Sequence, residues 1–324
     1  MKKLLMLTGL TLMLFVSGCT SQGVNYSKSL FQHIPEDPEV LVLVRPNDVV
    51  TVAEMAIAEL KLQELFGDKL QFDAKSLEMY KTMADQMLNA LGIPWDNVES
   101  FGFLLYMNKP VLLVSGGFTQ QLVTDKMTDV GFKQFDNGYF EYVYSGMKLH
   151  IPADGLIMMA SEEILDDLSM IPEDNRLWNR PDFKVYRTTS PLDNSLFVWS
   201  HPPENFLSDF KYRDALGDVS LAMNFRNNLS MKAAVRVKDP QKAVLLHDIV
   251  LGGVTMARGF FGEDADYGPL FKGMKVSHNQ SQVEASLVLS ADQMASLKAR
   301  MIEDFNNPEA NTWKKIQDSL NFLH

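Results

Sequence analysis

The chain of 324 residues repeats a pattern of short segments in the same order, and this repetition constrains its fold more than any other feature. Each copy begins with Pro-x-Asp, an apolar strand, a proline and an acidic residue. A strand, an asparagine-containing turn, a second strand and a helix-capping residue follow. The repetition predicts two related units. The matching positions are Pro35 and Pro191, Ser100 and Ser220, Gly146-Met147-Lys148 and Gly273-Met274-Lys275, and Ser161 and Ser290.

The offset between matching positions falls from 156 at Pro35 to 120 at Ser100, so the first unit carries 36 additional residues. Apolar residues in this insertion recur at helical spacing. Asp48 and Asp73 stand where each of two helices would begin, and Gly92-Ile93-Pro94 is a stop signal. We therefore predict that the first unit contains an extra helical insertion.

Tight-turn residues separate the predicted strands. Asp136-Asn137-Gly138 and Ala153-Asp154-Gly155 each lie between two apolar segments, and Asn227-Asn228 interrupts the stretch 219–237. Asn-Gly and Asp-Gly provide the positive φ angles that hairpins require. Strands in hairpins that alternate with single helices favour an α+β fold of antiparallel hairpins with helices packed on the sheet.

The amino terminus has the three parts of an export signal. Lys2 and Lys3 precede an apolar run from Leu4 to Val16, and Ser17-Gly18-Cys19 follows. The run is shorter than the ~20 apolar residues that a lasting membrane span needs. Cys19 is the only cysteine of the chain.

Val16-Ser17-Gly18-Cys19 resembles the lipobox of bacterial lipoproteins. The resemblance covers residues 1–19 and implies that a lipid, with palmitate among its acyl chains, is attached to Cys19 after cleavage before it. Thr20 and Ser21 stand where such proteins carry aspartate when they stay in the inner membrane. The absence of aspartate at these two positions favours an outer-membrane location that faces the periplasm.

The body as a whole resembles uncharacterised exported bacterial proteins that contain a duplicated α+β unit. The resemblance rests on Ile34-Pro35-Glu36-Asp37-Pro38 and on Arg180-Pro181-Asp182-Phe183, and it extends over residues 34–305. These motifs are structural, so the resemblance implies no catalytic residue.

Charge and cysteine content exclude several classes of function. Removal of residues 1–18 removes two lysines and no acid, which takes the formal charge from −11 to −13. Nucleic-acid binding requires clustered cations, so no nucleic acid is expected as a partner. With Cys19 lipidated, no thiol remains for a disulfide, a zinc-thiolate site or a nucleophile.

No catalytic motif is present, and we predict no cofactor and no metal. The six histidines form no zinc-protease pattern and are interpreted as surface-loop residues. Serine-hydrolase motifs are missing. The acidic stretch 263–268 has alternate carboxylates, but Lys275 stands where a calcium loop needs glutamate, which favours a solvated loop. A carboxylate pair remains open, because its spacing is spatial.

The connector between the units offers the best candidate for partner binding. Large aromatic residues alternate there with arginines, and both types are enriched at binding hot spots. The alternative is that the aromatic side chains pack the two units together while the charges are solvated. The candidate residues are Trp178, Arg180, Phe183 and Arg187.

These observations predict a lipid-anchored envelope protein, not an enzyme, that binds or scaffolds an envelope protein or a cell-wall component. One alternative is a cell-wall or polysaccharide hydrolase with a carboxylate pair in a groove lined by Trp95 or Trp199. Another is a carrier of lipid or another apolar ligand in a methionine-lined cavity. The predicted divisions are a signal peptide (1–18), a lipidated tether (19–33), the first unit with its connector (34–190), the second unit (191–306) and a C-terminal amphipathic helix (307–324).

Overall fold

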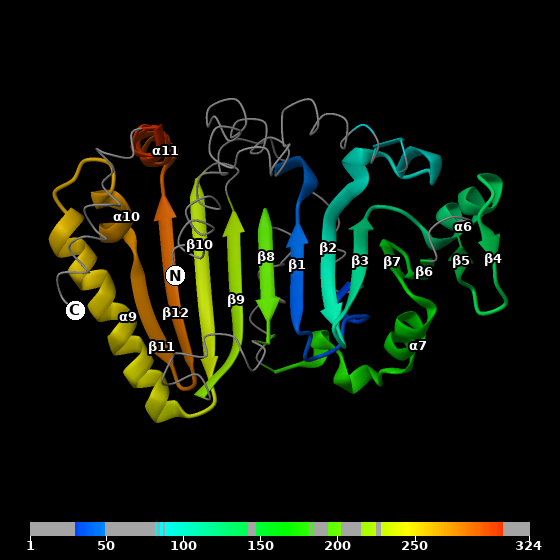
Figure 1. Cartoon of the computed structure of the whole chain (residues 1–324), viewed down its shortest axis with the longest axis horizontal. Helices are drawn as coiled ribbons and strands as arrows, with labels where there is room; N and C mark the ends of the chain where they lie inside the picture. Colours follow the sequence, from blue (N-terminus) through cyan, green and yellow to red (C-terminus); the bar gives the residue numbers. More distant parts are fainter. Residues whose placement is uncertain are drawn as a thin grey trace.

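A computed structural model describes residues 30–48, 82, 85–86, 88–141, 147–181, 183, 194–201, 215–224 and 228–306. Its centre is one twelve-stranded antiparallel sheet in the order β11-β12-β10-β9-β8-β1-β2-β3-β7-β6-β5-β4 (Figure 1). Several helices accompany the sheet. The predicted α+β class with antiparallel strands is confirmed.

The first half of the fold contains β1 and the elements up to and including the start of the connector. They are β1 (Val40–Val44), the 3-10 turn η2 (Trp95–Asn97), β2 (Val98–Tyr106), β3 (Lys109–Gly116), α6 (Gln120–Asp129), β4 (Lys133–Gln134), β5 (Phe140–Glu141), β6 (Lys148–Ala153), β7 (Leu156–Ala160), α7 (Glu162–Met170), and the 3-10 turns η3 (Glu173–Asn175) and η4 (Leu177–Asn179).

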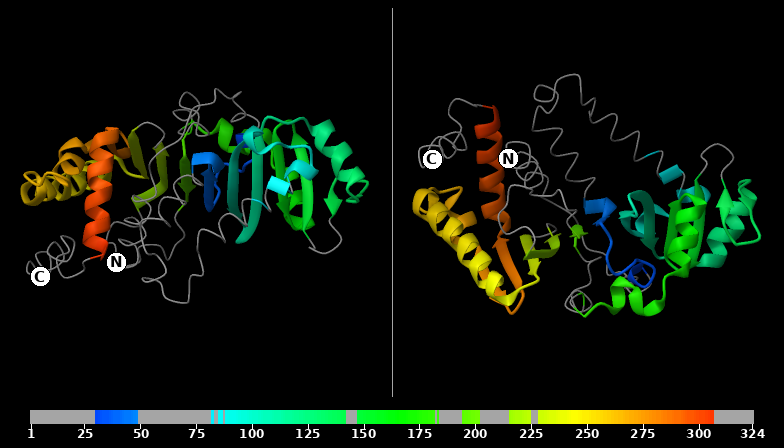
Figure 2. Two further views of the ribbon diagram at one scale, coloured as in Figure 1. Left: turned by 90° about the horizontal axis from the view of Figure 1, so that it is seen from above. Right: turned by 60° about the horizontal axis from the view of Figure 1, so that its bottom comes forward.

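The second half contains the elements that follow the connector. They are β8 (Leu196–Ser200), β9 (Leu216–Asn224), β10 (Leu229–Val237), α9 (Pro240–Phe261), α10 (Gly268–Gly273), β11 (Lys275–Asn279), β12 (Gln282–Leu289) and α11 (Ala291–Asn306). The long helix α9 lies at the β11 end of the sheet, as both views in Figure 2 show.

The two halves have the same strand order when each is read outward from the centre. One half runs β1-β2-β3-β7-β6, and the other runs β8-β9-β10-β12-β11. The halves meet where β1 pairs antiparallel with β8, and Val42 lies directly opposite Val198. These two valines are also separated by the sequence offset of 156 found for Pro35 and Pro191. A local two-fold relation therefore passes through this pair.

Turns and caps follow the residues that predicted them. Gly138 and Gly155 have φ angles of +81° and +74° in their hairpins, and Asn108 has +58° between β2 and β3. Ser161 and Ser290 stand at the N-caps of α7 and α11, since these helices begin at the next residue. In α11 the Ser290 hydroxyl accepts from the backbone N–H of Gln293 at 3.2 Å.

The largest core joins the two halves. Leu41 and Leu104 of the first half, Phe197 and Trp199 of β8, and residues of α7 belong to one buried cluster. A second cluster packs α6 against the first half. In the second half, one cluster contains residues of α10 and α11, and another contains Ala243 of α9. Burial of residues from both halves in one cluster makes the central seam part of the hydrophobic core.

Several predicted segments lie outside the described residues. These are the signal peptide, Cys19 and its tether, nearly all of the helical insertion after Asp48, the turn at Asn227, and the C-terminal helix 307–324. They stay predictions.

Candidate functional site

The connector predicted to bind a partner packs against the core. Phe183 is completely buried, with its ring centroid 4.8 Å from that of Phe31 and 5.5 Å from that of Trp199. Trp178 is half-buried and packs against the same cluster, and Arg187 lies outside the described residues. Phe183 thus has the packing position that the alternative interpretation gives the aromatic residues.

Backbone pairing fixes the connector against the segment before β1. The N–H of Leu177 donates to the carbonyl of Ile34 at 2.9 Å, and Arg176 forms a bridge with Pro35. The Arg176 guanidinium also donates to the carbonyl of His33 at 3.1 Å. Burial lowers the pKa of Arg176 below its usual value. Backbone and side-chain hydrogen bonds therefore fix the connector to the start of the first unit.

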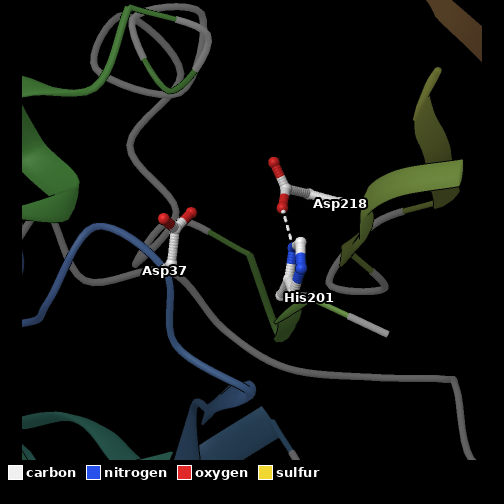
Figure 3. A group of neighbouring side chains, drawn as sticks. All are labelled: Asp37, His201 and Asp218. Atoms are coloured by element: carbon white, nitrogen blue, oxygen red, sulfur yellow. Dashed lines mark hydrogen bonds and ion pairs between the residues drawn. The ribbon is translucent and has the colours of Figure 1, made fainter. Parts of the chain in front are cut away.

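Arg180 is at the centre of a network of ion pairs, and Figure 3 shows three other side chains of this network, Asp37, His201 and Asp218. The Arg180 side chain is only 7% exposed, and it pairs with Asp37 before β1 and with Asp218 of β9. Arg236 of β10 pairs with the same Asp218 oxygen at 2.8 Å, and Nδ1 of His201 lies 2.9 Å from the other oxygen. The network joins the connector, the first half and the second half.

Arg180 was predicted to bind a partner, with a solvated charge as the alternative, and the structure places it inside this network instead. The cause is geometric, because Asp37, Asp218 and Arg236 are far apart in the sequence but converge at the seam. Arg180 and Asp37 stood out in the sequence, as part of the connector and of the Pro-x-Asp segment. Asp218 and Arg236 carry no local motif, so folding alone brings them to this site.

Three possible metal ligands come together in this network, one atom from each of Asp37, His201 and Asp218. These atoms lie within 4.8 Å of one another, a spacing that can hold a metal ion. However, the guanidinium groups of Arg180 and Arg236 occupy the same carboxylates. Both oxygens of Asp218 already have charged or polar partners. A cation would have to displace these partners, so the arrangement fits a structural ion-pair network better than a metal centre.

A second group of titratable side chains lies under α7. The hydroxyl of Tyr139 donates to Oδ1 of Asp166 at 2.8 Å, and burial together with this contact raises the pKa of Tyr139 to about 12. The Tyr139 ring stands edge-on to His150, with centroids 4.9 Å apart. The raised pKa keeps the phenol protonated, so the contact with Asp166 does not activate Tyr139 as a nucleophile.

His150 differs from the surface-loop residue that the sequence analysis expected. It lies within strand β6, is half-buried, and its Nδ1 is buried without a hydrogen-bond partner among the described residues. Burial lowers its pKa, with a further contribution from His33. His278 lies on β11, where its ring is 4.8 Å from that of His247 of α9.

The residues named for the two alternative functions have structural positions. Trp199 is buried in the central core, and Trp95 is half-buried and donates its indole N–H to Asn47. Met158 belongs to the central cluster, whereas its neighbour Met159 packs against the cluster under α6. These two methionines fill separate cores.

Helix α9 exposes an unusual amount of apolar surface. It is 22 residues long and contains an 18-residue stretch with a mean hydropathy of 1.4, so by length and composition alone it could cross a membrane. Its outward residues are 40% to 61% exposed. The run of apolar residues and glycines in this helix is visible in the sequence, but no functional role was predicted for it. The exposed residues are Val244, Leu245, Ile249, Met256 and Phe260.

Comparisons with known proteins supply no family for the chain. No protein-family model and no curated protein matches it. Among solved structures, crystal form III of TP0453 is similar at a TM-score of 0.39 with 10% identity, over 86% of this chain and 99% of that one. Crystal form IV of TP0453 has the same TM-score, with 11% identity over 82% and 95%. Similarity this distant transfers neither a fold assignment nor a function.

Proposed function

We propose that the chain is a lipid-anchored protein of the bacterial cell envelope that binds or scaffolds another envelope component and is not an enzyme. The observation that carries this proposal is the lipobox-like Val16-Ser17-Gly18-Cys19, which contains the only cysteine of the chain. Two acyl chains on one residue are sufficient for stable anchoring, whereas one is marginal. The ion pairs around Arg180 support a structural role for the polar cluster at the seam.

The tether would hold the body close to the bilayer. Ten residues lie between Cys19 and Leu30, which enters the central core. Fully extended, the eleven residue steps from Cys19 to Leu30 span about 36–40 Å. A partner or wall component within that distance of the membrane is therefore accessible to the body.

Mass spectrometry of the protein purified from membranes tests the anchor directly. We expect the first peptide to begin at Cys19 and to carry a diacylglyceryl group and a third acyl chain on its nitrogen. Cys19→Ala should retain the leader and carry no lipid, while the neighbouring Ser21→Ala should be processed normally. An unmodified Cys19 in the mature protein would overturn the proposal. Sucrose-gradient separation of the membranes tests the outer-membrane location.

Crosslinking in intact cells tests the connector as a partner surface. Trp178 is half-buried against the central core, and Arg187 lies outside the described residues, so these are the two members of the predicted patch to change. We expect Trp178→Ala with Arg187→Glu to remove a specific crosslinked partner, and Lys109→Ala, at an exposed ion pair, to leave it. Equal crosslinking by the wild type, the double variant and Lys109→Ala would exclude the connector as the partner-binding surface.

We also infer that the two units arose by duplication of one α+β unit. The shared strand order and the pairing of Val42 with Val198 support this inference. So do the matching N-caps at Thr119 and Asp239, whose side chains both accept a backbone hydrogen bond. A homologue that contains a single unit and pairs its first strand with a second copy would test it.

A further inference from the structure

The outward apolar residues of α9 form one continuous stripe. Leu245, Ile249, Gly252, Met256 and Phe260 follow one another at intervals of three or four residues, which places them on one side of a helix. At 1.5 Å per residue the stripe is about 22 Å long. It contains no charged residue, and Lys242 and Asp248 lie at its N-terminal end and on its flank. Water is a poor environment for a surface of this kind.

The opposite side of α9 is fixed to the protein. Ala243 and Val254 are buried, and Ala243 shares a cluster with residues of β10 and β12. Near the other end, Arg258 donates from Nε to the carbonyl of Phe271 at 2.9 Å and from Nη2 to that of Met274. A helix held along one side cannot cross a bilayer without leaving the sheet. It can lie in the membrane plane.

We propose that this α9 stripe rests in the boundary between the headgroups and acyl chains of the membrane that carries the Cys19 anchor. The inference depends on the proposed function for its geometry. Phe31 enters the core beside β1, and β11, next to α9, is five strand spacings away, about 24 Å. A tether of about 36–40 Å therefore allows the bilayer and the stripe to meet.

The charge of the protein determines which lipid surface the stripe fits. The mature body has a formal charge of −13, so an anionic surface repels it, and Asp248 beside the stripe adds to this repulsion. Membrane contact by α9 must therefore be apolar. Binding to neutral phosphatidylcholine should equal or exceed binding to phosphatidylglycerol, and added salt should not weaken it.

Two other occupants are outcomes of the test. The C-terminal segment has its own apolar residues, from Trp313 to Leu323, but as a helix they would extend over only about 15 Å. They would leave about a third of the α9 stripe uncovered. A second copy of the chain is the other occupant. Neither would bring the stripe near acyl chains.

Site-directed fluorescence on the lipidated full chain distinguishes these occupants. Acylation blocks Cys19, so a new cysteine can be labelled alone with an environment-sensitive dye. Met256→Cys and Phe260→Cys report on the stripe. Leu122→Cys and Val130→Cys, at or just after α6 and similarly exposed at 42% and 43%, are matched controls in the other half of the sheet. The proteins are reconstituted into phosphatidylcholine vesicles that contain lipids with a nitroxide on the acyl chain.

We expect quenching at 256 and 260 to be at least about fivefold stronger than at 122 and 130, because an interfacial helix lies within reach of the acyl chains. Ile249→Glu combined with Met256→Cys should abolish the difference while the protein remains vesicle-bound through its lipid. Equal quenching at all four positions would overturn the proposal. So would a dye at 256 that is shielded without quenching, as a second copy or the C-terminal segment would produce.

The result is separable from the anchor. The mass of the same preparation reports acylation of Cys19, so a missing lipid and missing quenching are distinct observations. If Cys19 proves unmodified, it is replaced by serine before labelling, and vesicles are added in excess. The same contrast between 256 and 122 is then required. Circular dichroism melts of each variant confirm that the fold is retained.

Discussion

Arg180 is the residue at which the connector and both halves of the sheet are linked by charge. Its partner Asp218 has a side chain only 2% exposed, so removal of the arginine leaves a buried carboxylate with one guanidinium fewer. Loss of one member of a buried ion pair costs about 3–5 kcal/mol. The exposed partner Asp37 contributes less, because solvent screens its charge.

We therefore expect Arg180→Met to lower the free energy of unfolding by about 3 kcal/mol, measured by urea denaturation. Lys109→Met breaks an ion pair whose two side chains are 45% and 70% exposed, and should cost at most about 1 kcal/mol. The double variant Arg180→Met with Asp218→Asn should lose less unfolding free energy than the sum of the losses in the two single variants. Equal effects of the arginine and lysine substitutions would contradict a structural role for the network.

Tyr139 gives the fold a dependence on alkaline pH. Its folded pKa of about 12 lies above the ordinary value of 10, so the folded state keeps the phenol proton longer than the unfolded state. The resulting stabilisation is complete below pH 10 and is lost as the pH rises from 10 to 12. Tyr139→Phe should lower stability by about 1–3 kcal/mol at pH 8 by removing the bond to Asp166.

The difference in unfolding free energy between the wild type and Tyr139→Phe should shrink steadily above pH 10, in urea titrations at each pH. Other groups titrate in the same range in both proteins, and taking the difference cancels them. A difference that stays constant to pH 12 would show that the Tyr139 proton is not retained by the fold.

At the scale of the element, the end of β3 depends on a backbone contact that only glycine allows. A Cβ at Gly116 would lie 2.0 Å from the carbonyl oxygen of Asn97, and the next N–H, of Gly117, donates to the same oxygen at 2.7 Å. Gly116→Ala should therefore cost about 1–3 kcal/mol through forced backbone movement. Gly252→Ala, where a Cβ meets nothing within 4 Å, should gain up to about 1 kcal/mol in urea denaturation. Similar effects at both positions would refute this explanation.

Hairpins and caps were predictable from the sequence because their causes are local. Gly138 and Gly155 each provide a positive φ, and Ser290 caps the helix that follows it. The burial of Arg180 and of His150 was not predictable, because both depend on residues distant in the chain. The apolar face of α9 also escaped prediction. Composition marks such a helix as a core element, and only the packed structure shows one side uncovered.

At the scale of the whole molecule, the seam between β1 and β8 joins the halves into one sheet and one core. A change at the seam should therefore be felt in both halves. With Arg180→Met, hydrogen exchange measured by mass spectrometry should accelerate together in peptides covering β2 and β9. Faster exchange in one half alone would show that the halves open independently.

The sequence matches predicted two related units, and the two halves have the same order of strands. The offset of 156 found at Pro35 and Pro191 also separates the paired residues Val42 and Val198. The sequence could not show that the units meet through their first strands. That contact depends on which edge each unit leaves open, and pairing between edges has no local signature.

A seam of this kind has a consequence for any attempt to divide the protein. Separated from its companion, the first half would present β1, and the second half β8, as an edge strand with unpaired backbone N–H and C=O groups. The first half would also lose the Phe197 ring that packs edge-on against Phe31. Two copies of one half could satisfy these backbone groups by pairing their exposed edge strands with each other. Within the intact chain the second half already supplies that partner edge, so neither β1 nor β8 is left without a neighbouring strand.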